Sequence, residues 1–137
     1  MLNSTTIDRY LHAILVLQNQ FPVVRAVDVA EWLDCTKPSV SVAVKQMLQE
    51  GLVSIGHHFA LILTGDGARR AHAFHARYDF FHSLLTEAGV SADTAKKESD
   101  ALACSLSSPS LNAIRKHFPI DGPGAARPGS PQQPSSL

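Results

Sequence analysis

Residues 24–64 read VRAVDVAEWLDCTKPSVSVAVKQMLQEGLVSIGHHFALILT, and three patterns follow one another within them. Apolar residues recur at helical spacing, first over residues 27–33 and again over residues 40–48. Gly51 ends the second helical pattern, and short alternating apolar runs then occupy residues 53–63. The order of helix, tight turn, helix and two-stranded hairpin predicts a winged helix-turn-helix.

The start of the second helix carries the side chains that point to a function. The Thr36 hydroxyl can cap the first N–H groups of this helix, and Pro38 suits a first turn because its missing N–H costs nothing there. Each residue alone is simply a good helix start, but the full order of elements favours a DNA reader, whose second helix offers side chains to bases and phosphates. The predicted DNA-binding residues are Arg25, Thr36, Lys37, Pro38, Ser39, Ser41 and Lys45.

The predicted hairpin has Phe59, Leu61 and Leu63 as the alternating apolar run of its second strand. Its tip is Gly56-His57-His58, where two adjacent histidines could suggest a metal site. Neighbouring residues of a hairpin point to opposite faces, so we expect a solvated tip that contacts a phosphate or the minor groove.

Composition limits the classes of partner. The 137 residues contain 12 basic and 12 acidic side chains, so a nucleic acid would need a local basic patch. Two distant cysteines do not form a disulfide framework, and they favour a reducing, cytoplasmic location. No apolar run suits a bilayer span and no signal-peptide profile begins the chain. No nucleophile elbow, phosphate loop or dinucleotide fingerprint indicates an enzyme.

The rest of the chain is predicted to be mainly helical. Residues 4–20 form a first helix capped by Thr5 or Thr6, and residues 64–88 form a long helix with a broad aromatic stripe. That stripe could fill a core, but we favour a dimer interface. Two shorter helices begin at Ser91 and at Ser108-Pro109. The predicted domains are a winged helix-turn-helix DNA-binding domain at residues 1–70, a helical dimerisation and degenerate metal-site domain at residues 71–119, and a disordered Pro/Gly/Ser tail at residues 120–137.

The motifs DRYLHAI, KPSVS followed by EGLV, and LTGDGARRA together resemble the diphtheria toxin repressor and manganese transport regulator family. The resemblance covers about residues 4–118, without the third domain of the longer members. It implies a homodimer that binds palindromic double-stranded DNA, usually with Mn²⁺ or Fe²⁺ bound. Val42 stands where the diphtheria-type members have Gln, so we expect base reading to be weak or to rest on thymine methyl contacts.

The resemblance also implies a metal site between the first helix, the long helix and the helix that follows Ser91. The family's ligand places fall on Arg9, His12, Tyr78, Asp100, Ala103 and Cys104. Only one of the family's acids, Asp100, is kept.

Two interpretations of these places remain open. In the first, His12, Asp100 and Cys104 form a reduced metal site, with His82 as a possible addition, for a divalent transition metal ion such as Fe²⁺ or Zn²⁺ rather than Mn²⁺. In the second, which we favour, no ion binds and Arg9 takes its place by pairing with Asp100 or Asp8. A further alternative is that Arg9, His12 and Asp100 are ordinary solvated residues and that Cys104 is a small core residue. Cys104 could instead act as a redox sensor.

The sequence thus predicts a homodimeric DNA-binding transcriptional regulator that resembles metal-dependent repressors, and the interpretation we favour frees it from metal control. The alternative is a winged-helix protein-interaction module that acts through a partner transcription protein. A third hypothesis is a sensor of a small ligand in the cavity that the ion has left.

Overall fold

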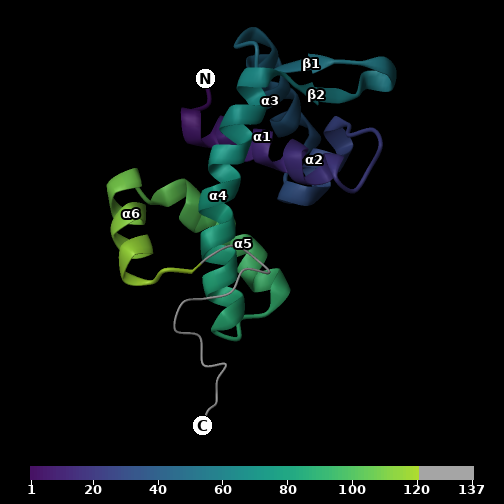
Figure 1. Ribbon diagram of the computed structural model, residues 1–137. Coiled ribbons are helices and arrows are strands. Elements are labelled where there is room, and N and C mark those ends of the chain that lie inside the picture. The colour runs from purple at the N-terminus through teal and green to yellow at the C-terminus, as the bar shows by residue number, and fades with distance from the viewer. Residues whose placement is uncertain (121–137) are drawn as a thin grey trace. The chain divides into compact units, whose positions relative to one another are not determined.

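The computed structural model describes residues 1–120, and the predicted disordered tail lies outside the described residues from residue 121 onward. The chain forms α1 (Ser4–Gln18), α2 (Ala26–Leu33), α3 (Lys37–Gln49), β1 (Val53–Ile55), β2 (Leu61–Leu63), α4 (Gly65–Glu87), α5 (Ala92–Ser105) and α6 (Ser108–His117) (Figure 1). The mainly helical winged-helix fold predicted from the sequence is confirmed. Among the described helices, none is both long and apolar enough to cross a bilayer.

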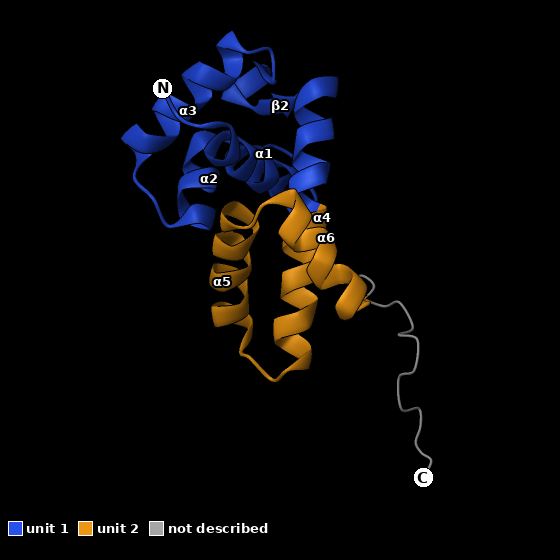
Figure 2. Cartoon of the chain, turned by 90° about the vertical axis from the view of Figure 1, so that its left-hand side faces the viewer, with its two compact units in different colours: residues 1–75 blue, residues 76–137 orange. Residues whose placement is uncertain are grey.

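The chain divides into two compact units, Met1–His75 and Ala76–Leu137 (Figure 2). Helix α4 begins in unit 1 and continues into unit 2. The predicted domain boundary at residues 70 and 71 stays a prediction.

Unit 1 has its core around α1, which contacts α2, α3 and β2. The predicted apolar stripe of α1 is buried, and Ile7, Leu11 and Ile14 are almost inaccessible to solvent. The stripe meets Val29 of α2 and Met47 of α3 in one cluster. Helical spacing places these apolar side chains on one face of each helix, so burying them together fixes how the three helices pack.

The ends of α1 differ from the prediction. Its cap is Asn3, whose side chain accepts a hydrogen bond from the Thr6 N–H at 2.8 Å, so the predicted cap at Thr5 or Thr6 is wrong. Asparagine is among the strongest helix caps, and its position directly before Ser4 lets its side chain satisfy an orphan N–H group of the first turn. The helix ends at Gln18, two residues before the predicted end.

The turn between α2 and α3 follows the prediction closely. Asp34 ends α2 in the left-handed conformation, at φ 54° and ψ 50°. Thr36 then caps α3, where its hydroxyl accepts from the Ser39 N–H at 3.3 Å, and Pro38 lies in the first turn. Local residue types alone therefore fix the point at which α3 starts.

The wing is a two-stranded antiparallel hairpin, in which Val53 faces Leu63 and Ile55 faces Leu61. The placement of Phe59 in its second strand is wrong. His58 and Phe59 both adopt left-handed backbone, at φ 59° and 62°, inside a short turn before β2. The side chain of Phe59 is consequently 81% exposed.

The join from the wing to α4 depends on a close backbone contact. The Thr64 hydroxyl donates to the Gly51 carbonyl at 2.7 Å and accepts from the Gly67 N–H at 3.1 Å, as a helix cap does. A Cβ on Gly67 would lie only 1.9 Å from the Leu52 carbonyl oxygen. Glycine at position 67 thus lets the start of α4 approach the chain that leads into β1.

Unit 2 buries part of the predicted aromatic stripe in its own core. Phe80 and Phe81 of α4 pack with Leu111 of α6, and Figure 2 shows α5 running back beside the second half of α4. Gly89 follows α4 in the left-handed region, at φ 95°, and Ser91 caps α5. Helix α6 begins at Ser108, as predicted, and its cap is Ser107, whose side chain accepts from the Ser110 N–H.

Candidate nucleic-acid interface

Helix α3 has one buried and one exposed face. Val40, Ala43 and Met47 are buried against the core of unit 1, whereas Val42 is 57% exposed. Every predicted DNA-binding residue is exposed; these residues are Arg25, Thr36, Lys37, Pro38, Ser39, Ser41 and Lys45. Lys37, Ser41 and Lys45 are spaced four apart, so they follow one edge of the exposed face.

The edge of α3 borders a groove of about 420 Å³. Lys37, Ser41 and Val44 line it from α3, Arg25, Ala26 and Val27 from the start of α2, and Ile55, Phe59 and Leu61 from the wing. The floor of the groove is mostly apolar, and the two positively charged side chains that line the groove are Arg25 and Lys37. The structure therefore brings Arg25, Lys37 and Ser41 together beside one opening, which the sequence did not show.

Arg25 joins two elements of this groove. Its Nε–H donates to the His58 carbonyl at 2.9 Å, and its backbone N–H donates to the Asp28 carboxylate at 2.8 Å. The first bond fastens the wing tip to the start of α2, and the second caps that helix. Arg25 consequently positions the wing as well as adding positive charge.

Thr36 is occupied by the helix start. Besides its bond from the Ser39 N–H, its hydroxyl lies 2.9 Å from the Ser39 hydroxyl. Both side chains therefore fix the first turn of α3, and Ser41 has no such local bond among the described contacts. Ser41 is accordingly better placed than Thr36 to offer its hydroxyl to a ligand.

The end of α3 is held by a network that the sequence analysis missed. The carboxamide of Gln46 accepts from the Leu2 N–H at 2.9 Å and donates to the Leu2 carbonyl and the Glu50 carboxylate. Arg70 of α4 donates to Asp8 at 2.6 Å and lies 3.8 Å from Glu50. Leu2 and Gln46 lie 44 positions apart in sequence, and Asp8 and Arg70 lie 62 positions apart. No local sequence pattern could therefore predict these pairs.

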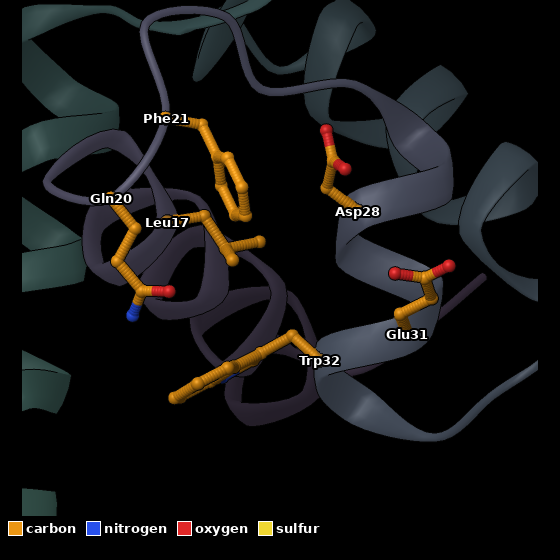
Figure 3. A pocket seen from close by; sticks show the side chains of 6 residues that line it. All are labelled: Leu17, Gln20, Phe21, Asp28, Glu31 and Trp32. Carbon is orange, nitrogen blue, oxygen red and sulfur yellow. The ribbon is translucent and has the colours of Figure 1, made fainter.

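A second hollow of unit 1, of about 230 Å³, has a different character. Figure 3 shows Leu17, Phe21 and Trp32 around it, with the carboxylates of Asp28 and Glu31 on the α2 side. Two negatively charged carboxylates beside the hollow would repel a phosphate group that entered it. The hollow is therefore unsuited to the DNA backbone, in contrast to the groove that Arg25 and Lys37 line.

The predicted metal ligand in unit 1 is His12, which is only 2% exposed. Its Nε2 lies 2.9 Å from Nδ1 of His75, and its ring packs at 5.1 Å from that of Phe74. Burial, followed by the nearby His75, lowers the pKa of His12 to about 3, so its imidazole is neutral near pH 7. Asp8 pairs with Arg70 in the same unit.

The other predicted ligands, Asp100 and Cys104, lie one turn apart on α5 in unit 2, and both are partly buried. Tyr78 stacks on His82 with ring centroids 5.5 Å apart. Burial, with smaller contributions from Asp100 and Asp79, raises the pKa of Tyr78 to about 12. Within either unit, the described residues form no cluster of three or more His, Cys, Asp or Glu side chains able to hold a metal ion.

The residues at these places do not fit the oxygen-rich site that Mn²⁺ prefers. Arg9 and Ala103 have no donor atom for a cation, and the phenol of Tyr78 stays protonated near neutral pH. His12, Asp100 and Cys104 have the chemistry for a softer ion, and that set stays a prediction.

The fold, the exposed face of α3 and its wing define a winged-helix DNA-binding domain. Residues 2–61 match the family model described as the iron dependent repressor, N-terminal DNA binding domain. The chain is 27% identical over 109 residues to the transcriptional regulator MntR of Escherichia coli O6:H1. The aligned stretch covers 80% of this chain and 70% of the relative. The comparisons thus bear out the resemblance to the diphtheria toxin repressor and manganese transport regulator family that the motifs predicted.

Solved structures agree with this relationship. A manganese-dependent transcriptional repressor in complex with manganese has a TM-score of 0.69 and 25% identity, over 81% of this chain and 51% of that one. The manganese regulator SloR has a TM-score of 0.68 and 23% identity, over 82% of this chain and 53% of that one. The chain spans about half the length of these solved relatives. The related proteins are transcriptional regulators and not enzymes.

Proposed function

We propose that this protein is a homodimeric transcriptional regulator that binds double-stranded DNA through α3 and the wing, in the cytoplasm. The observation that carries the proposal is that α3 has one buried and one exposed face. Its apolar face is packed into unit 1, and its cationic and hydroxyl-bearing face is exposed beside a groove. A recognition helix that enters the major groove of DNA is supported on one face by its own domain and exposes polar side chains on the other.

The chemistry assigns separate roles to the exposed side chains. Lys37 and Lys45 would neutralise phosphates, and Arg25 would contact a flanking phosphate while it holds the wing. Ser39 and Ser41 would reach base edges or phosphates through their hydroxyls, and Pro38 and Thr36 would fix the angle of the helix start. The exposed methyl groups of Val42 suit a thymine methyl.

We further propose that DNA binding does not need a metal ion. The support is the donor set, in which Arg9 brings a fixed positive charge to a place that holds an acid in the manganese regulators. An arginine–carboxylate pair can join two helices permanently, as an ion does reversibly. Unit 1 contains such a link, because Arg70 of α4 binds Asp8 of α1 at 2.6 Å.

Measuring DNA binding with and without metal ions tests both proposals, DNA binding itself and its independence from metal. Duplexes would be selected from a random pool, and their binding measured with chelator and with Mn²⁺, Fe²⁺ or Zn²⁺. We expect sequence-preferring binding of equal affinity in every condition. Binding that appears only with an ion, and that is lost in Asp100→Asn and Cys104→Ser, would instead support the reduced site with His12, Asp100 and Cys104.

A protein-interaction module remains the second candidate, and one observation favours it. Three large apolar side chains of the wing are exposed, namely Ile55, Phe59 and Ile62. Exposed apolar groups of this kind often mark protein contacts. A gel-shift series against genomic fragments separates the candidates, because a module that binds only protein would give no salt-dependent, sequence-preferring shift.

A further inference from the structure

The wing tip has an unusual backbone and presents an aromatic ring to solvent. His58 and Phe59 are consecutive residues with φ of 59° and 62°, a region that histidine, asparagine and aspartate enter more often than other residues but that is uncommon for phenylalanine. Phe59 is nevertheless 81% exposed, so little burial within the described chain offsets this strain. Strained backbone that packing does not explain is a reason to look for a function.

Hydrogen bonds fix the tip on both sides of this ring. The His58 carbonyl accepts from Nε–H of Arg25 at 2.9 Å. The His57 carbonyl accepts from the Ala60 N–H at 3.1 Å, and the Gly56 N–H donates to the Ala60 carbonyl at 2.8 Å. These bonds fix the backbone around Phe59, so the point from which its ring projects is preformed.

The position of Phe59 relates it to α3. Phe59 lines the same groove as Lys37 and Ser41, and Arg25 completes the cationic part of the lining. A duplex with its major groove on α3 would have an adjoining phosphate strand beside these cations. The tip, which belongs to the same unit, would then meet the neighbouring minor groove.

We propose that Phe59 is an apolar wedge that enters the minor groove next to the site read by α3 and partly unstacks one base step. Apolar side chains are used in this way by proteins that bend DNA, and pyrimidine–purine steps open most easily. Phe59 would thereby add sequence preference at a flanking step. This inference rests on the proposed DNA-binding function.

The test compares the full chain with Phe59→Ala, Phe59→Leu and Ile62→Ala. Ile62 is the matched control, since it is an exposed apolar residue of the wing, 48% exposed, that does not line the groove. Duplexes are selected from a random pool with each protein, and 2-aminopurine is placed at the flanking step to report unstacking. Thermal unfolding of every variant checks that it folds.

We expect selected duplexes to be enriched in TA or CA/TG at the flanking step, and 2-aminopurine fluorescence to rise on binding. Phe59→Ala should lose both signals and about tenfold in affinity, which lies within the range for losing one base–aromatic contact. Phe59→Leu should keep most of both signals because it still supplies an apolar wedge, and Ile62→Ala should behave as the unaltered chain.

Two results would overturn the inference in distinguishable ways. If the unaltered chain binds duplexes and Phe59→Ala keeps the affinity, step preference and fluorescence change, the wedge is wrong while the DNA-binding function stands. If the unaltered chain binds no duplex, both fail, and the exposed ring then belongs to a protein contact.

Discussion

His12 shows how the surroundings of a side chain set its charge. The imidazole is buried, and its Nε2 lies 2.9 Å from Nδ1 of His75. It stays neutral near pH 7, because charging it would cost desolvation energy and place a positive charge beside a second imidazole ring. The sequence could identify the position, but it could not show that His75, 63 residues away, is its partner.

The low pKa of His12 predicts an acid-sensitive fold. Below pH 6.5 the unfolded chain binds a proton on His12 that the folded chain does not bind until about pH 3. The free energy of unfolding should therefore fall as pH falls from 6.5 toward 3, by up to about 1.4 kcal/mol per pH unit from this group. Urea unfolding at pH 7.5 and 5.0 should show a pH-dependent loss roughly 2 kcal/mol smaller in His12→Gln than in the unaltered chain.

The exposed His72 supplies the control for this measurement. His72→Gln should keep the full pH dependence of the unaltered chain. If His12→Gln kept it as well, His12 would be protonated in the folded protein and its burial would have no such consequence.

At the scale of elements, helix starts were predictable and the wing tip was not. Thr36 and Ser91 cap their own helices through bonds from N–H groups three positions away, and Pro38 lies in the first turn, where its missing N–H costs nothing, so all three roles follow from local sequence. The tip depends on left-handed backbone at His58 and Phe59, and phenylalanine is a residue type that gives no sequence signal for this conformation. The hairpin pattern therefore gave the strands correctly and assigned Phe59 to the wrong environment.

Two glycines of the same turn allow a matched test of the join between the wing and α4. A Cβ at position 67 would meet the Leu52 carbonyl oxygen at 1.9 Å, whereas one at position 65 would meet nothing within 4 Å. Gly67→Ala should lower the free energy of unfolding by about 1–3 kcal/mol, because backbone must shift. Gly65→Ala should leave it unchanged or raise it by up to about 1 kcal/mol. Urea unfolding measures both.

Equal stability of the two glycine variants would contradict the close approach of α4 to the backbone at Leu52. Such a result would also leave the second glycine of the motif LTGDGARRA without a structural reason.

The cap of α3 predicts a separate effect on stability. Thr36→Ala should lower the free energy of unfolding by about 0.5–2 kcal/mol, since the Ser39 N–H loses its acceptor. Thr36→Ser keeps the hydroxyl and should lose little. Thermal unfolding compares the two variants, and a loss of equal size in both would show that the methyl group, rather than the cap, matters.

At the scale of the molecule, the sequence predicted the class of fold and the exposed face of α3, because both depend on periodicity within single helices. It could not give the groove, which needs residues of α2, α3 and the wing together. Nor could it show that Phe80 and Phe81 fill the core of unit 2, where a dimer interface was the favoured interpretation. The homodimer consequently rests on the family relationship and not on that stripe.

The homodimer predicts how chain and duplex combine. Sedimentation of the complex should give two chains per duplex, and the selected sequences should be palindromic. Their half-site centres should lie about 10 base pairs apart or at a multiple of that, because the two recognition helices must meet the same side of the duplex. A complex of one chain on a non-palindromic site would contradict the symmetric arrangement.

The salt dependence of DNA binding tests the central claim most directly. The observed slope of log K against log salt measures the phosphates that the protein neutralises, at about −0.9 for each one. We predict that Lys37→Ala and Lys45→Ala each flatten this slope by about 0.9 per recognition helix bound, and that Lys97→Ala, an exposed lysine of α5, leaves it unchanged. An unchanged slope in the Lys37 and Lys45 variants would show that α3 does not face the DNA.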